Sequence, residues 1–307
     1  MEQIKISVII PFYDHIDWLK EAVDSVLLQT YKNIEIIVIN DGSNEDVTSF
    51  LDEYGEKIIY EYKSNSGPGA TRNRGIEIAS GDYICFLDSD DVWLPYKVQM
   101  QLEFMLVNGY VWSHTGGEYF ASDLKERKTF NFCHNSGWVA RRSLISMQVA
   151  TPSVMIRSDI LKKDVNLRFN ANMRFSQDSF LYMLLSQYYE LGYLNEKCVL
   201  IRLRNIIEGN GHINASKRFR IRFIGRVILY NFMNSSENPI IKPLPTYINC
   251  FFKQFLLGDK LLRYLERKAW SKKKVEFIAK FLFLYLFLFG RVYIYVNDYI
   301  YNLEFKR

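Results

Sequence analysis

Short apolar runs alternate with helical patterns along the first third of the chain. Three runs, residues 6–10, 34–39 and 83–87, each end in a polar loop. Between the first two runs, apolar residues recur at helical spacing at Ile16, Leu19, Val23, Val26 and Leu27. Strands that alternate with helices predict an α/β fold with a mainly parallel sheet and right-handed crossovers. Because such sheets bind ligands at the carboxyl ends of their strands, we expect a site where the polar loops meet.

Length and composition fit one α/β domain with an accessory region. With 307 residues, 49% of them hydrophobic, the chain can bury one such domain and an additional helical part. A strand pattern begins close to the N-terminus without a signal-peptide pattern, so we expect a cytoplasmic protein. The four widely spaced cysteines favour reduced thiols over a disulfide framework.

Charge divides the chain into two parts. Residues 1–216 hold 21 Lys and Arg against 28 Asp and Glu, a net charge of −7, whereas residues 217–307 hold 18 against 6, a net charge of +12. In the second part basic residues alternate with large apolar ones, which is typical of a surface for anionic lipid headgroups. No nucleic-acid motif accompanies this charge, so nucleic acid is not an expected partner.

The apolar stretch 277–296 lies within this basic region. It contains Lys280 and Arg291, which disfavour a membrane-spanning helix, and its longest uncharged run is too short to span a bilayer. We therefore predict that residues 217–307 form a helical region that lies on the membrane surface. A helical core or a homodimer contact is the alternative.

Three carboxylates follow the third apolar run, in Asp88-Ser89-Asp90-Asp91. Oxygen ligands at a strand end suit Mg²⁺ or Mn²⁺, and Mg²⁺ usually binds through one or two carboxylates with phosphate oxygens completing its shell. The cluster therefore indicates a metal-bridged phosphate ligand. The same residue types are also typical of a turn followed by a helix cap.

A loop rich in glycine lies between the second and third polar loops, at residues 65–75. Its glycines and proline predict a turn into a helix whose N-terminus favours an anion, with Arg72 or Arg74 adding a charge-assisted contact. Because Arg72 stands where a dinucleotide fingerprint has its last glycine, the loop is not of that kind. An ordinary loop and helix start is the alternative.

Together these motifs resemble the inverting family 2 glycosyltransferases, which have the GT-A fold. The likeness covers roughly residues 4–110 and keeps its motifs in order: residues 7–11 with Tyr13, 29–31, 38–43, Asn65, Gly67, Arg72, Asn73, Gly75, 81–84 and 86–91. It implies a Rossmann-like, mainly parallel central sheet flanked by helices. It also implies a catalytic domain at residues 1–216, with a nucleotide-sugar-binding half at 1–110 and an acceptor half at 111–216.

The resemblance implies a donor site for a nucleotide sugar. The loop from Pro11 to Tyr13 would pack around the base, and Asp41 would hydrogen-bond the pyrimidine. A carboxylate accepts the imide N–H of uracil or thymine, which cytosine lacks, so the donor is expected to be a UDP or dTDP sugar. The remaining donor-binding residues implied are Asn65, Gly67, Arg72, Asp88 and Ser89.

A metal ion, Mn²⁺ or Mg²⁺, belongs to the same implied site. Asp90 would be its principal ligand, with Asp88 beside the ribose and also near the metal. Asp91 would cap the next helix or support the site from behind. The metal would stabilise charge on the departing diphosphate.

The family places its catalytic base in a Glu-Asp pair that precedes a helix. Here the matching residues are Gln177 and Asp178, followed by apolar residues at helical spacing: Leu181, Leu184, Leu185 and Tyr188. Asp178 is the expected base, which takes the acceptor proton as the hydroxyl attacks opposite the leaving group, so the anomeric centre inverts. Gln177 replaces the first acid of the pair. A helix cap is the alternative role for Asp178.

Two further segments resemble parts of the family. Residues 151–157 look like its strand before the base helix, and residues 199–204 look like its closing strand, where many members carry Arg-x-His. This chain has Arg204 at the His position. An arginine cannot ligate the metal, but it would hold diphosphate oxygens.

The expected function is that of a metal-dependent hexosyltransferase using a UDP-sugar donor. Its acceptor would be a lipid-linked or surface glycan in capsule, O-antigen or lipooligosaccharide biosynthesis, at the inner face of the cytoplasmic membrane. A sugar nucleotidyltransferase is a second reading, against which the lack of a Gly-rich triphosphate loop argues. A non-catalytic subunit that binds UDP-sugar or membrane is a third reading, which Gln177 and Arg204 leave open.

Overall fold

The computed structural model describes residues 4–120, 127–130, 136–143, 147, 149–171, 173 and 177–203. The chain divides into two units, Met1–Val139 with Gln148–Arg204, and Ala140–Met147 with Asn205–Arg307. The elements, in chain order, are β1 (Ile6–Phe12), α1 (Ile16–Leu27), β2 (Ile34–Asp41), α2 (Thr48–Tyr54), η1 (Gly55–Lys57), β3 (Ile59–Lys63), α3 (Pro68–Ile78), β4 (Tyr83–Phe86), β5 (Val92–Trp93), α4 (Lys97–Asn108), β6 (Trp112–Phe120), β7 (Arg127–Phe130), α5 (Ala140–Ser143), η2 (Thr151–Ser153), β8 (Met155–Arg157), α6 (Ser158–Lys163), α7 (Gln177–Tyr188) and β9 (Leu191–Arg202).

Within the described residues, nine strands form one sheet in the order β3-β2-β1-β4-β8-β6-β9-β5, with β7 paired to β6. Strands β3, β2, β1 and β4 run parallel, as the βαβ pattern predicts. Beyond them β8 is antiparallel to β4 and to β6, whereas β9 runs parallel to β6. The expected α/β sheet flanked by helices is confirmed, and the sheet is mixed in its second half.

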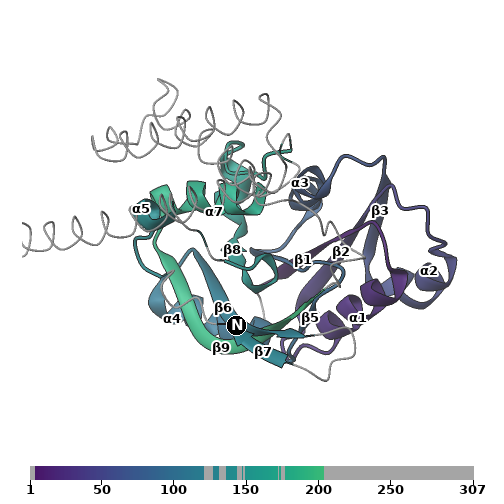
Figure 1. Ribbon diagram of the computed structural model, residues 1–307, viewed down its shortest axis with the longest axis horizontal. Helices are drawn as coiled ribbons and strands as arrows, with labels where there is room; N and C mark the ends of the chain where they lie inside the picture. Colours follow the sequence, from purple (N-terminus) through teal and green to yellow (C-terminus); the bar gives the residue numbers. More distant parts are fainter. Residues whose placement is uncertain are drawn as a thin grey trace, which may run out of the picture. The chain divides into compact units, whose positions relative to one another are not determined.

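Helices cover both faces of the sheet. In Figure 1, α3 and α7 lie along one side of the sheet and α1 and α4 along the other. Val8 and Ile10 of β1 are buried in a cluster with Leu19 of α1, whereas Ile9 faces α3, where a Cβ on Gly75 would lie 2.4 Å from its Cγ2. Because both faces are buried, the strands are continuous apolar runs instead of alternating ones.

The sequence expectations fail at several element boundaries. The strand expected at 151–157 is wrong for its first residues, because η2 (Thr151–Ser153) is a 3₁₀ turn in which Pro152 has no N–H for a sheet ladder. The closing strand begins at Leu191, well before residue 199. Strand β5 is a short strand that directly follows the carboxylate cluster, and it pairs with β9.

Two expectations concern parts that the structure does not describe. Arg204 and residues 217–307 lie outside the described residues. Among the helices that are described, none is both long and apolar enough to cross a membrane.

Candidate active site

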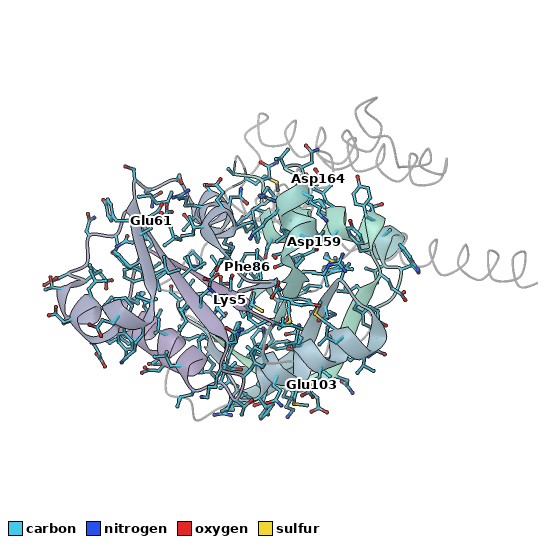
Figure 2. The ribbon with its side chains drawn as sticks, turned by 180° about the vertical axis from the view of Figure 1, so that it is seen from behind. Lys5, Glu61, Phe86, Glu103, Asp159 and Asp164 are labelled. Atoms are coloured by element: carbon cyan, nitrogen blue, oxygen red, sulfur yellow. The ribbon has the colours of Figure 1, made fainter. Side chains whose placement is uncertain are left out.

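The strand ends bring two of the predicted polar loops to one edge of the sheet. Strand β2 ends at Asp41, and β4 ends at Phe86, shortly before Asp88. Both strands pair in parallel with β1, with Asn40 opposite Phe12 and Phe86 opposite Ile9. Phe86 lies in the middle of the packed side chains (Figure 2). Asp41 and the loop at residues 88–91, called here the carboxylate loop, therefore share the carboxyl edge that we expected from the sequence.

The four residues of the carboxylate loop face different ways. Asp88 and Asp90 are partly exposed, whereas Ser89 and Asp91 are buried. Asp91 turns inward and accepts a hydrogen bond from the backbone N–H of Arg202 at 2.8 Å. Burial raises the pKa of Asp91 well above its usual range, and the neighbouring charges of Asp90 and Asp88 add to the shift. Asp88 and Asp90 are thus the carboxylates of this loop that a ligand can reach.

Arg202, at the end of β9, holds the carboxylate loop from behind. Its Nε donates to the backbone oxygen of Asp90 at 2.9 Å, and its Nη2 pairs with Glu21 of α1 at 2.5 Å. The guanidinium also lies 4.6 Å from the ring centroid of Phe120 and 5.0 Å from that of Trp18. Sequence reasoning emphasised Arg204 and missed Arg202, although Arg202 is the arginine of the Arg-x-His-like triplet.

Arg72 of α3 lies beneath the carboxylate loop. It is 6% exposed, and its Nη2 forms an ion pair with Asp88. Its Nε and Nη1 are buried and have no hydrogen-bond partner among the described residues. Burial lowers the pKa of Arg72, but the charges of Asp88 and Asp178 outweigh this and the net shift is upward. The guanidinium is therefore electrostatically coupled to both carboxylates.

Asp178, the predicted base, lies in the first turn of α7 and is partly exposed. Its Oδ2 accepts a hydrogen bond from the Thr151 hydroxyl at 3.2 Å, and its Oδ1 accepts from the N–H of Ser179 at 2.7 Å. One turn further along, Tyr182 is fully buried, and burial first and then the charge of Asp178 raise the pKa of its phenol. Thr151 and Tyr182 border the predicted base, and no sequence signal pointed to either.

Gln177, which replaces the family's first acid, is 6% exposed and packs against the start of α3. A Cβ on Gly69 would lie 3.1 Å from Cγ of Gln177, so the two helices meet closely there. The Oε1 atom of Gln177 is buried without a hydrogen-bond partner among the described residues. An ionised glutamate with the same unpaired oxygen would incur a larger desolvation cost, so an uncharged amide suits this position.

Asn73, the neighbour of Arg72 in the family motif, fixes the segment that leads towards α7. Its Nδ2 donates to the backbone oxygen of Phe169 at 2.8 Å, and its Oδ1 accepts the N–H of Phe169 at 3.0 Å. Phe169 in turn packs edge-on against Phe86 at 5.0 Å. This motif residue therefore acts through the backbone, by tying α3 to the chain ahead of the predicted base.

Hydrogen bonds join the loop after β1 to the loop after β2, in the region where the pyrimidine base of the donor is expected to bind. Glu45 accepts the N–H groups of His15 at 2.5 Å and Ile16 at 2.7 Å, which caps α1 from the neighbouring loop. The loop expected to begin at Pro11 begins later, because Pro11 lies inside β1, opposite Ile39 of β2. Tyr13, just after β1, is 50% exposed, so its ring is open to a ligand.

Asp41 is 4% exposed and accepts hydrogen bonds from the loop that begins α3. The N–H of Ser66 donates to Oδ1 and the N–H of Gly67 to Oδ2, both at 2.9 Å. Asn65 is exposed just before this contact, and Gly67 has a φ of 87°, which favours glycine. The glycine-rich loop and the carboxylate of Asp41 are therefore one hydrogen-bonded unit.

The carboxylate oxygens of the carboxylate loop suit a divalent cation whose remaining ligands are phosphate oxygens and water. Within the described ranges, no three His, Cys, Asp or Glu side chains gather to hold a metal. Asp88 and Asp90 supply hard oxygen ligands at the accessible side of the loop. Mg²⁺ and similar ions bind readily through one or two carboxylates when phosphate oxygens and water fill the other positions.

Comparison with known proteins adds to this geometry. Residues 7–162 match the family described as glycosyl transferase family 2. An uncharacterised glycosyltransferase of Rickettsia felis is 30% identical over 279 residues, which cover 90% of this chain and 44% of that protein. The putative teichuronic acid biosynthesis glycosyltransferase TuaG of Bacillus subtilis is 38% identical over 122 residues, which cover 38% of this chain and 48% of that protein. The chain thus spans less than half of the length of these two relatives.

A solved structure shares the fold. The structure of S. aureus TarS residues 1–349 in complex with UDP-GlcNAc superposes with a TM-score of 0.61 and 18% identity, over 85% of this chain and 73% of that one.

Proposed function

This chain belongs to glycosyltransferase family 2, and from that premise we propose that it transfers a sugar from a UDP-sugar to a hydroxyl group of a cell-surface glycan or glycolipid. The observation that carries the proposal is the arrangement at the carboxyl edge of the sheet. Asp41 ends β2, the carboxylate loop follows β4, and Arg72 forms an ion pair with Asp88 of that loop, while the charge of Asp178 helps to raise the pKa of Arg72. A nucleotide-binding carboxylate, a metal-binding loop and a base are the three parts that such a transfer requires.

Binding of the donor is assigned to the N-terminal half, residues 1–110. The open ring of Tyr13 and the carboxylate of Asp41 suit a pyrimidine base, and Pro11 would contact the base from the end of β1. The N–H groups at the start of α3, near Asn65 and Gly67, favour the diphosphate. Arg72, Asp88 and Ser89 are proposed to complete the donor site. The solved complex of TarS with UDP-GlcNAc supports a UDP-sugar as the donor class.

Asp90 and Asp88 are the residues proposed to hold Mn²⁺ or Mg²⁺. When bound, the ion would neutralise charge that develops on the departing diphosphate. The chain's own part is to present these carboxylates from a fixed loop. Arg202 contributes to this by binding the Asp90 carbonyl, and Asp91 by accepting the Arg202 N–H.

Asp178 is the proposed catalytic base. It would accept the proton of the acceptor hydroxyl as that oxygen attacks the anomeric carbon from the face opposite the leaving group, which inverts the configuration. The hydrogen bonds from Thr151 and from the Ser179 N–H orient the carboxylate and leave part of it exposed. The acceptor would be bound by the half at residues 111–216.

The basic region at residues 217–307 is proposed to bring the enzyme to the inner face of the cytoplasmic membrane, where a lipid-linked acceptor is available. The charge pattern of the sequence supports this part of the proposal, because each Lys or Arg close to anionic lipid contributes about 1 kcal/mol of binding free energy. The teichuronic acid pathway in the description of TuaG agrees with a role in surface polysaccharide assembly.

Calorimetric titration of the purified chain with UDP, with and without Mn²⁺, tests the proposal. We expect metal-dependent binding of UDP, with CDP and GDP bound much more weakly. Absence of UDP binding under both conditions would overturn the catalytic proposal and favour a non-catalytic subunit. Consumption of a sugar phosphate and UTP, with release of pyrophosphate, would instead indicate a nucleotidyltransferase.

A further inference from the structure

Lys63, at the end of β3, lies directly beside the carboxylate proposed to contact the base. Strands β2 and β3 are parallel, and Asp41 and Lys63 are partners in their register. The ammonium group of Lys63 forms an ion pair with Oδ1 of Asp41, and the side chains are 21% and 6% exposed. This pair is therefore largely removed from water.

The hydrogen bonds of Lys63 account for all three of its ammonium protons. Besides Asp41, Nζ donates to the Ser66 hydroxyl and to the backbone oxygen of Ser64 at 3.0 Å. The Thr71 hydroxyl lies further away, at 3.4 Å. An ammonium group has three protons to donate. Lys63 therefore has no ammonium proton left to donate to a ligand. It can influence a bound ligand only through Asp41.

The Asp41 carboxylate accepts hydrogen bonds from Lys63, Ser66 and Gly67, and these three leave one of its accepting positions unused. Oδ1 accepts from Lys63 and from the Ser66 N–H, whereas among the described residues Oδ2 accepts only from the Gly67 N–H. Each carboxylate oxygen accepts about two hydrogen bonds. The remaining position is on Oδ2, and it suits one further N–H donor.

The charge of Asp41 decides which pyrimidine that position accepts. Ring atom N3 of uracil carries a proton, whereas N3 of cytosine is an acceptor and is repelled by a carboxylate. Discrimination between the two bases therefore depends on which carboxylate oxygen is presented to the base, and the bonds from Lys63 and the Ser66 N–H to Oδ1 fix that orientation.

We propose that Lys63 is a specificity-determining residue, which makes the site select uracil over cytosine by holding the Asp41 carboxylate through Oδ1 and leaving its Oδ2 to the base. This inference rests on the proposed UDP-sugar function. It assigns to Lys63 a positioning role and no direct contact with the donor.

The test is the ratio of the dissociation constants of CDP and UDP, both measured with Mn²⁺ on the same preparation. In Lys63→Met we expect UDP to bind more weakly and CDP not to weaken in parallel, so that the ratio falls by roughly tenfold, the effect of about 1.4 kcal/mol. Because both nucleotides are titrated into one preparation, an unfolded fraction affects both measurements alike. The ratio of the two dissociation constants can therefore still be compared with that of the wild type. Lys63→Arg, which keeps the charge, should retain most of the wild-type ratio.

Two further variants separate the possible explanations. Lys20→Met removes a partly exposed lysine that pairs with Glu53 at 3.6 Å, and it should leave the ratio unchanged. Asp41→Asn, whose amide can either donate or accept, should lose discrimination as Lys63→Met does. The inference is overturned if Lys63→Met weakens UDP and CDP binding equally, or if the ratio is undiminished in Lys63→Met or in Asp41→Asn. Either result would leave the proposed function standing. Failure of the wild-type chain to bind UDP would overturn the proposed function along with the inference.

Discussion

The backbone N–H of Arg202 donates to Oδ1 of Asp91 at 2.8 Å, across 111 residues of sequence. This bond ties the last described strand to the carboxylate loop, and it explains why Asp91 faces inward while Asp88 and Asp90 remain accessible. The side chain of Arg202 adds a second tie, to the Asp90 carbonyl. The shape of the proposed metal site therefore depends on a residue far away in the sequence.

Replacing the Arg202 side chain should weaken that loop. In Arg202→Met we expect the free energy of unfolding to fall by about 1–3 kcal/mol, since the partly buried Asp90 carbonyl loses its donor and Glu21 loses its partner. Urea denaturation measures this, and calorimetry should show weaker Mn²⁺-dependent UDP binding. Arg157→Met is the control, because Arg157 pairs with Asp159 at the surface, and it should cost less than about 1 kcal/mol. Equal effects in the two variants would contradict the role given to Arg202.

Asp90 and Asp178 should separate donor binding from turnover. Asp90→Ala removes a carboxylate from the proposed metal site and should abolish metal-dependent UDP binding. Asp178→Asn keeps the side-chain shape and should leave UDP affinity within about threefold while lowering turnover by about 10²–10⁴-fold, the usual range for a lost general base. Calorimetry and donor-consumption assays measure the two quantities. The division of roles fails if both variants lose donor affinity equally.

Gly75 allows α3 to approach β1, so a methyl group there should destabilise the fold. In Gly75→Ala the new Cβ would lie 2.4 Å from Cγ2 of Ile9, and overpacking of this kind costs about 1–3 kcal/mol. Gly55→Ala is a matched control, because a Cβ on Gly55 meets nothing within 4 Å and its φ is −54°. Chemical denaturation should show a large loss only for Gly75→Ala.

Asn73 should matter more for turnover than for UDP binding. Asn73→Ala removes both hydrogen bonds to Phe169 and leaves its backbone groups without that partner, at a cost of about 1–3 kcal/mol. Because Phe169 lies ahead of α7, we expect turnover to fall further than UDP affinity. Asn108→Ala, which loses one exposed bond to the Phe104 carbonyl, serves as the control. A loss confined to UDP affinity would contradict this assignment.

Glu35 should contribute to the pH dependence of stability. Burial alone would raise its pKa, but hydrogen bonds from Lys5, Ser7 and Ser80 outweigh that and lower it from 4.5 to about 2. A lowered pKa means that the stabilisation is present above pH 4.5 and is lost as the pH falls towards 2. In Glu35→Gln the stability deficit relative to wild type should therefore shrink as urea unfolding is measured at successively lower pH. A deficit that stays constant would contradict the prediction.

Much of the fold and site was readable from the sequence because its signals are local. The apolar runs and the helical spacing of Leu19 and Val23 predicted the βαβ units, and the order of the motifs indicated the family. The same signals brought Asp41 and the carboxylate loop to one edge, since parallel strands share their carboxyl ends. The 3₁₀ turn at Thr151–Ser153 and the antiparallel strands beyond β4 escaped this reasoning, because their pairing depends on distant partners.

The sequence by itself determined the fold class, the family and the residue types of the proposed site. Tertiary structure alone decided that Asp91 faces inward, that Gln177 packs against α3, and that Lys63 pairs with Asp41. The physical reason is that periodicity and motifs report which element a residue belongs to and which face it occupies. The partner of a buried charge depends instead on the register and packing between elements, which only the folded chain fixes.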